Sequence, residues 1–149
     1  MADLHIYDVA RILEEFAPPA LAEDYDNVGL LVGEPGERVR AVLIALDITP
    51  AVLQEAVRHG ANLVISHHPI WFRSRKSLRG DDFVSQQILF AIRNGLALYA
   101  CHTNLDNIKE GATRAIASRL GLTETRFLAP RTPEAPDSFC QAGSGMIGD

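Results

Sequence analysis

The sequence contains few cysteines and no long apolar run. Only two of its 149 residues are cysteines, too few for the disulfide framework of a small secreted domain, so we expect reduced thiols. No apolar stretch approaches the roughly 18 residues that a membrane span needs. Residues 1–5 carry no basic segment leading into an apolar one, so a secretory signal is not expected. These absences favour a cytoplasmic protein that does not enter the membrane.

The sequence also lacks an excess of basic residues. Its formal net charge is −5, from 14 basic and 19 acidic side chains, which argues against a broad nucleic-acid-binding face. It has no internal repeat and no low-complexity tract. The length is sufficient for one domain with a real core, and the 47% hydrophobic content is typical of globular proteins.

Apolar periodicity predicts alternating strands and helices. Strands are expected at residues 28–32, 41–46, 63–67 and 96–101, and helices at 4–16, 50–59, 82–94 and 111–120. The near-continuous apolar run at 41–46 is typical of a strand that is covered on both faces. The pattern predicts an α/β fold with a mainly parallel sheet and helices on both faces. We expect residues 1–128 to form this domain, and 129–149 a proline-rich connector, with a strand at 138–142, that starts an incomplete second part.

The strand at 63–67 ends abruptly in two adjacent histidines, His67 and His68, before Pro69. Neighbouring side chains of an extended segment point to opposite sides, so the two imidazoles are not expected to serve one metal in the same way. The two imidazoles could bind two different metal ions of a pair. Alternatively, one imidazole could bind an ion and the other could contact the water bound to that ion. The alternative is two ordinary histidines of a surface loop.

Other polar residues follow the remaining predicted strands. His102 follows the strand at 96–101 and Asp106 comes four residues later, whereas Asp47 follows the strand at 41–46 and Asp26 precedes the strand at 28–32. Strands of a parallel sheet end at the same edge, so we expect these side chains to converge there. Nitrogen and oxygen ligands suit zinc, iron(II) or manganese, which the sequence does not distinguish. Cys101 should point the other way, as a packed core thiol rather than a ligand.

Two further segments, the basic loop after Pro69 and the glycine-rich residues 143–148, could be interpreted as ligand-binding motifs. Arg73, Arg75, Lys76 and Arg79 form a basic cluster after Pro69, which is either a solvated loop or a phosphate-binding segment, and the neighbouring Trp71 and Phe72 either anchor the loop or stack on a base. Residues 143–148 match the GxGxxG dinucleotide fingerprint, but no helix follows in the sequence, so we do not interpret them as a phosphate-binding loop.

Four segments together resemble one family: Asp-Asn-Val-Gly-Leu at 26–30, Asp-Ile-Thr at 47–49, Ser-His-His-Pro at 66–69 and His-Thr-Asn-Leu-Asp at 102–106. The sequence is similar to the Nif-three-like (NGG-one-interacting-factor-three) family, whose members are also called GTP cyclohydrolase I type 2 homologues. The similarity runs in order and spacing over residues 4–122, with a weaker match at 143–148.

The resemblance implies an α/β fold, frequent assembly into ring-shaped hexamers, and a site for two divalent metal ions. It assigns His67 and Asp106 to one ion and His68 to the other, with His102 as a further ligand, a partner that orients the ligands, or a proton shuttle. The family name implies a metal-dependent hydrolase that opens a nucleotide or related heterocycle. The alternative is a non-catalytic, metal-binding regulatory module that recognises protein partners.

The sequence departs from the family pattern beyond Asp106. Family members supply a later His-x-x-x-Glu pair, and this chain has no histidine after Asp106; Met146 stands in place of the usual arginine, and Glu110 in place of a glycine. The resemblance therefore implies a truncated protein, or a half whose site is completed by water, a ligand or another subunit. We expect one ion or a weakly held pair, and little or no activity for this chain alone.

Overall fold

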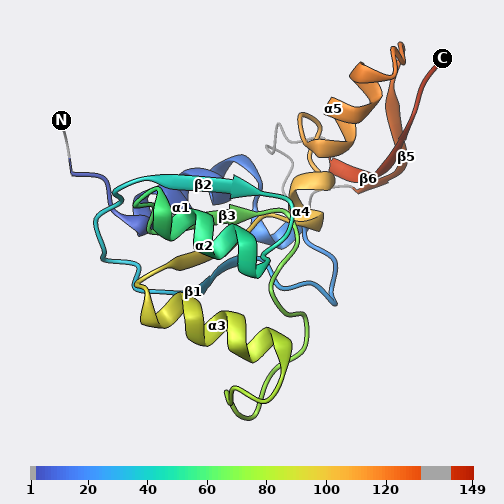
Figure 1. Ribbon diagram of the computed structural model, residues 1–149. Coiled ribbons are helices and arrows are strands. Elements are labelled where there is room, and N and C mark those ends of the chain that lie inside the picture. The colour runs from blue at the N-terminus through green and yellow to red at the C-terminus, as the bar shows by residue number, and fades with distance from the viewer. Residues whose placement is uncertain (1–2, 132–141) are drawn as a thin grey trace.

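The computed structural model describes residues 3–131 and 142–149, arranged around a four-stranded sheet (Figure 1). The strands are β1 (Gly29–Val32), β2 (Val42–Ala45), β3 (Leu63–Ser66) and β4 (Ala97–Ala100), in the order β1-β4-β3-β2. The pairs β2–β3 and β3–β4 are parallel, and β1 joins β4 antiparallel. The predicted mainly parallel sheet is confirmed.

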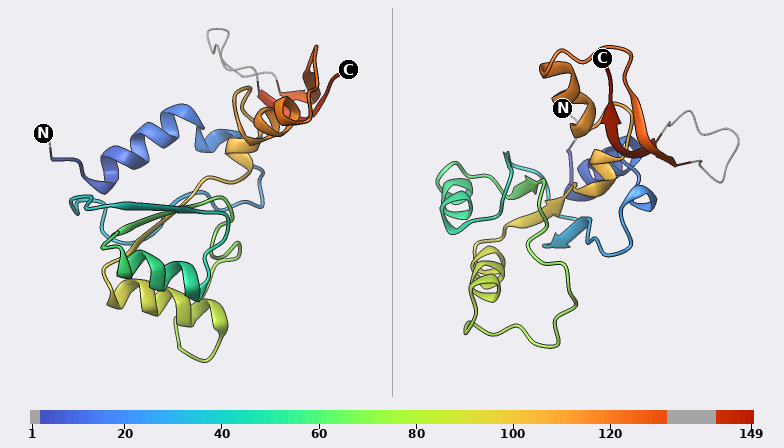
Figure 2. Two further views of the ribbon diagram at one scale, coloured as in Figure 1. Left: turned by 45° about the horizontal axis from the view of Figure 1, so that its top comes forward. Right: turned by 90° about the vertical axis from the view of Figure 1, so that its right-hand side faces the viewer.

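Helices cover both faces of this sheet (Figure 2). On one face α2 (Pro50–Arg58) and α3 (Phe83–Arg93) bury a core that includes Leu53, Val64 and Leu98. On the other face α1 (Ile6–Phe16) packs against β4 and β3 through Ile6 and Ala10. Polar side chains cap the N-termini of α2 and α3, since Thr49 Oγ1 and Asp82 Oδ1 accept hydrogen bonds from the backbone N–H groups of Val52 and Ser85.

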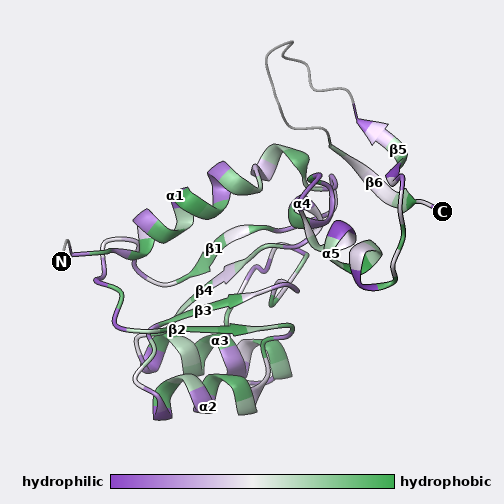
Figure 3. Ribbon diagram, turned by 90° about the horizontal axis from the view of Figure 1, so that it is seen from above, coloured by the Kyte–Doolittle hydropathy of each residue, from purple (hydrophilic) through white to green (hydrophobic). Residues whose placement is uncertain are grey.

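Strand β2 differs from the prediction because only one of its faces is covered. Leu43 packs into the core with α2 and α3, but Val42 and Ile44, on the opposite face, are 40% and 78% exposed. The reason is the position of α1, whose core contacts reach β1, β4 and β3 and do not include β2. Figure 3 shows α1 beside β1, across the sheet from β2. The expectation of a strand covered on both faces is wrong here.

A smaller unit follows the sheet. It comprises α4 (Thr103–Asp106), α5 (Ala112–Arg119) and the antiparallel pair β5 (Arg126–Arg131) and β6 (Ala142–Ile147). Residues 143–147 belong to β6, so the glycine-rich segment is a strand and not a phosphate-binding loop. The predicted boundary at 128/129 falls within β5, and the division into two parts stays a prediction. The strand expected at 138–142 lies outside the described residues except for Ala142.

Glu23 joins this smaller unit to the segment before β1. Its carboxylate accepts hydrogen bonds from Asn107 Nδ2 at 3.1 Å and Ser144 Oγ at 3.2 Å, and it pairs with Arg131. The hydrogen bond from Asn107 lowers the pKa of Glu23, partial burial opposes this shift, and Arg131 adds to it. The ionised carboxylate therefore holds β5 and β6 in place.

This junction should weaken in acid. A carboxyl group whose pKa is lowered by folding stabilises the folded state above its ordinary pKa of 4.5, and this contribution is lost as the pH falls through the folded value. We expect the protection of the β6 amides against hydrogen exchange, measured relative to the unfolded chain at each pH, to fall below pH 4.5 before that of β3 and β4. Glu23→Gln should accelerate exchange of β6 at neutral pH, whereas Glu15→Gln, at an exposed position on α1, should not. Equal exchange in both variants would contradict this role.

Candidate metal centre

Three histidines converge at the carboxyl ends of the parallel strands. His67 and His68 directly follow β3, and His102 lies between β4 and α4. One ring nitrogen from each of the three lies within 4.8 Å of the other two. The expected convergence at this edge of the sheet is therefore present in the structure.

The two adjacent histidines do not point to opposite sides as predicted. Their ring centroids are 5.0 Å apart, and both rings reach His102, whose centroid lies 5.0 Å from that of His67 and 5.5 Å from that of His68. The reason is that β3 ends at Ser66, so both histidines lie in a bend where the alternation of a strand no longer applies. Both imidazoles can thus face one ion.

Each of the three rings is oriented by an acceptor at Nδ1. The partner of His67 is the carbonyl oxygen of Cys101 at 2.9 Å, that of His68 is Asp47 Oδ1 at 2.7 Å, and that of His102 is Asp26 Oδ1 at 2.9 Å. A carbonyl oxygen or an ionised carboxylate can only accept, so Nδ1 carries the proton in each ring. The lone pair of a neutral imidazole is then on Nε2, as required of a metal ligand.

Of the two carboxylate acceptors, Asp26 has the more buried side chain. Its side chain has no exposed surface, and besides His102 it accepts hydrogen bonds from the backbone N–H groups of Asn27 at 2.7 Å and Thr103 at 3.0 Å and from the Thr103 hydroxyl. Burial raises the pKa of Asp26, but the hydrogen bonds from Thr103, His102 and Asn27 outweigh it, and the net pKa is lowered. The carboxylate therefore stays ionised beside His102 at neutral pH.

Asp106 lies at the edge of the cluster. Its Oδ2 is 3.7 Å from Nε2 of His67, and it is not within the 4.8 Å group that the three histidines form. The two side chains are thus in contact, and the shared metal ion that the resemblance implies for them stays a prediction. The Cys101 side chain is buried in the core under α1, and burial raises the pKa of its thiol to about 11. A neutral, buried thiol is a packed core residue, as expected.

Three contacts around the histidines were not assigned from the sequence. The Phe72 ring lies edge-on to His102 with centroids 5.6 Å apart, and it is 47% exposed. Asn27 Nδ2 donates a hydrogen bond to the carbonyl oxygen of Trp71 at 2.9 Å. This bond connects the loop that contains Trp71 and Phe72 to the segment that contains Asp26. The Thr103 hydroxyl anchors Asp26. The motif at 102–106 contained Thr103, but only the folded chain places it against a residue 77 positions earlier.

The basic cluster is only partly available to a ligand. Arg75 pairs with Asp82 at 2.6 Å and Arg79 with Asp81 at 2.9 Å, so two of the four cations are engaged within the loop itself. The hydrogen bonds of Asp82 with Ser85, and its pairing with Arg75, lower the pKa of this carboxyl to about 2. The structure thus supports a loop-stabilising role for Arg75 and Arg79.

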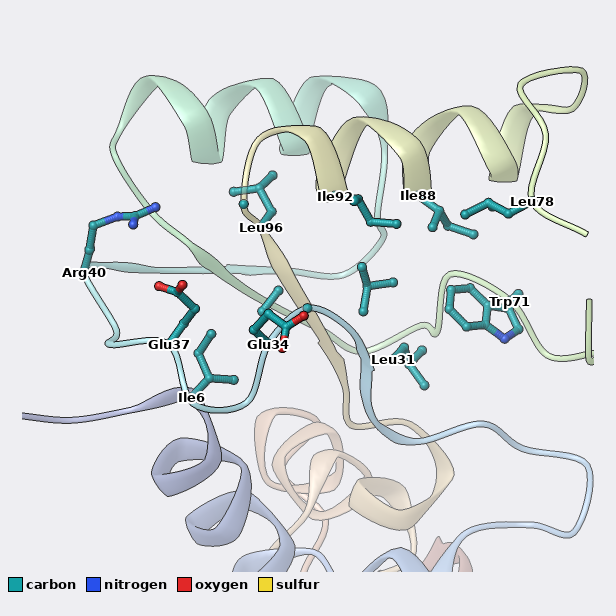
Figure 4. Close-up of a pocket in the computed structure, with 14 residues that line it drawn as sticks. Ile6, Leu31, Glu34, Glu37, Arg40, Trp71, Leu78, Ile88, Ile92 and Leu96 are labelled. Carbon is teal, nitrogen blue, oxygen red and sulfur yellow. The ribbon is translucent and has the colours of Figure 1, made fainter.

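A separate cavity of about 580 Å³ lies between α3 and β1 (Figure 4). Leu31, Ile88 and Leu96 contribute apolar walls, and Glu34, Glu37 and Arg40 add charged groups. Trp71 lines this cavity, and the next residue, Phe72, contacts His102. No histidine of the cluster lines this cavity, so the cluster lies outside it.

Comparisons with known proteins identify the family and the fold of this chain. The family model Duf34/NIF3 (NGG1p interacting factor 3) matches residues 4–149. A Clostridium acetobutylicum protein named GTP cyclohydrolase 1 type 2 homolog is 40% identical over 144 residues, which are 97% of this chain and 52% of that protein. The crystal structure of a Bacillus cereus protein related to NIF3 superimposes with a TM-score of 0.83 at 38% identity, covering 89% of this chain and 36% of that one.

A more distant structure shares the fold. The structure described as reduced HcgD from Methanocaldococcus jannaschii has a TM-score of 0.76 at 28% identity, over 85% of this chain and 51% of that one. The chain thus spans about half or less of the length of these relatives. Among the described residues, no helix is both long enough and apolar enough to cross a membrane.

Proposed function

Because this chain belongs to the Duf34/NIF3 family, we propose that it binds a divalent metal ion through His67, His68 and His102, with Asp106 beside His67. The observation that carries the proposal is the engagement of all three Nδ1 atoms, which leaves three Nε2 lone pairs for one ion. Three imidazoles suit zinc, iron(II) or manganese. The backbone carbonyl and the two carboxylates would fix the rings before the ion arrives.

We further propose that the site supports hydrolysis of a nucleotide or related heterocycle. A bound divalent ion lowers the pKa of water and polarises the group under attack. In the alternative arrangement, in which His67, His68 and Asp106 hold the ion without His102, the Nε2 atom of His102 would serve as the proton shuttle, with its ring oriented by Asp26 at Nδ1. The exposed Phe72 ring beside His102 offers an apolar face for a flat heterocycle. Arg73 and Lys76 are the cations of the basic cluster that a phosphate could use.

The second candidate is a metal-binding module without catalytic activity. It is favoured by the position of the cavity of about 580 Å³, because no histidine of the cluster lines this cavity. We propose that the chain alone holds one ion, or a weakly bound pair, and turns over substrate slowly or not at all. A cytoplasmic location and assembly into homo-oligomers belong to the same proposal.

Metal analysis followed by a nucleotide panel separates the two candidates. We expect close to one zinc, iron or manganese ion per chain after gel filtration, and hydrolysis of a purine nucleotide at a low rate that His67→Ala abolishes. His59→Ala, which replaces an exposed histidine outside the cluster, should leave both metal content and rate unchanged. Retained metal without turnover would select the non-catalytic module. Two tightly held ions per chain would contradict the proposed stoichiometry.

A further inference from the structure

The cavity of about 580 Å³ between α3 and β1 has three charged side chains toward one end (Figure 4). Glu34, Glu37 and Arg40 all come from the connection between β1 and β2. Among the described residues, neither the two carboxylates nor the guanidinium group forms an ion pair, not even with one another. Two anionic groups and one cationic group are therefore available to a ligand in this cavity.

Hydrogen bonds hold the backbone that carries these charges. The backbone N–H of Ile6 donates to the carbonyl oxygen of Glu37 at 2.9 Å, and the N–H of Glu37 donates to the carbonyl oxygen of Glu34 at 3.1 Å. The buried Asn62 accepts a hydrogen bond at Oδ1 from the N–H of Arg40 at 2.8 Å. The connection is thus ordered before a ligand arrives, which lowers the entropic cost of binding.

The remainder of the cavity is largely apolar. Ile88 and Leu96 are 4% and 2% exposed and form buried walls, and Leu31 adds to them. Trp71 and Leu78 lie toward the end that is away from Arg40 (Figure 4). Sites for small molecules are typically mainly apolar cavities of about 300–1,000 Å³ with a few polar groups that fix the orientation of the ligand. This cavity has both properties.

We propose that this cavity binds a free α-amino acid with a large apolar side chain. The ammonium group would donate to the carboxylates of Glu34 and Glu37, and the carboxylate would pair with the guanidinium group of Arg40. The apolar side chain would extend past Ile88 toward Trp71. An apolar amine would leave Arg40 without a partner, and an apolar acid would leave both carboxylates without one. A zwitterion satisfies charges of both signs.

This site is distinct from the candidate metal centre. No histidine of the cluster lines the cavity, and neither Asp26 nor Asp106 does. The inference therefore goes beyond the proposed function and does not depend on it. Amino-acid binding can be tested on protein that has been treated with a chelator.

Calorimetry and tryptophan fluorescence of the whole chain test the ligand class. Trp71 is the single tryptophan of the sequence, so a ligand that reaches it should alter the fluorescence. We expect saturable binding of L-phenylalanine or L-leucine with a change in this fluorescence. Glycine, phenethylamine and 3-phenylpropionate each lack one of the three recognised groups and should bind about 10-fold more weakly or worse. If neither amino acid bound, or if phenethylamine bound as tightly as L-phenylalanine, the proposal would be overturned.

Two variants test which side chain recognises which end of the ligand. Arg40→Gln should weaken binding of L-phenylalanine and 3-phenylpropionate about 10-fold and leave that of phenethylamine unchanged, whereas Glu37→Gln should weaken only the two ligands that carry an ammonium group. The matched control is Arg38→Gln, since Arg38 pairs with Asp3 and does not line the cavity. Circular dichroism melting confirms that each variant is folded. Equal affinities for L-phenylalanine in the Arg40→Gln and Arg38→Gln proteins would contradict the assignment.

Discussion

Replacing His67 with alanine is expected to lower the affinity for zinc by more than about 100-fold. Losing a partner that merely orients a ligand typically costs about 10–100-fold, and His67 is proposed to be a ligand itself. The ring is placed for this role, since its Nδ1 lies 2.9 Å from the Cys101 carbonyl oxygen and its Nε2 lies 3.7 Å from Asp106. Isothermal titration calorimetry with zinc measures the change directly.

The control for this experiment is His59→Ala. His59 ends α2, is exposed and does not belong to the cluster, so its removal should not alter zinc affinity. The His67→Ala protein should keep its far-UV circular dichroism and its unfolding midpoint, because His67 lies beyond the end of β3. If both variants bound zinc as the unaltered chain does, His67 would not be a ligand.

The second large effect is expected at Asp26. Asp26→Ala removes the acceptor shared by the N–H groups of Asn27 and Thr103, the Thr103 hydroxyl and His102 Nδ1. Leaving a buried donor without a partner costs about 1–3 kcal/mol, so with four donors affected we expect a loss of about 4 kcal/mol or more in unfolding free energy. Zinc affinity should also fall by about 10–100-fold, since His102 is no longer held in one tautomer.

Two control variants separate the effect of Asp26 on stability from its effect on zinc affinity. Asp24→Ala removes an exposed carboxylate two residues away and should change neither quantity. Asp26→Asn keeps the volume and one acceptor oxygen, so it should recover part of the stability but place an amide N–H₂ against one of the donors. Urea unfolding reports the stability and calorimetry the affinity. An Asp26→Ala protein that is destabilised but binds zinc normally would show that Asp26 acts on the fold alone.

The main strands and helices were predictable because their patterns are local. The apolar runs at 63–67 and 96–101 and the helical periodicity at 50–59 and 82–94 identify β3, β4, α2 and α3 to within a few residues. Helix α4 was missed because four residues are too few for an apolar period. The exposed face of β2 was missed because an apolar run does not say which layer covers it; that depends on where α1 packs.

The candidate site could be predicted in composition but not in geometry. The rule that parallel strands end at one edge was enough to collect His67, His68, His102 and Asp106. The rule does not say where β3 ends. Because the strand ends at Ser66, the two adjacent imidazoles lie beyond it and turn to the same side. The roles of Asp26 and Thr103 arise from contacts across more than 70 residues of sequence. Such contacts leave no local pattern to recognise.

Anomalous diffraction from crystals soaked in zinc tests the central claim most directly. The account predicts a peak bonded to Nε2 of His67, His68 and His102 at about 2.0–2.1 Å, with each Nδ1 still held by its carbonyl or carboxylate partner. A zinc ion bound elsewhere, or bound through Nδ1 of any of these rings, would contradict it.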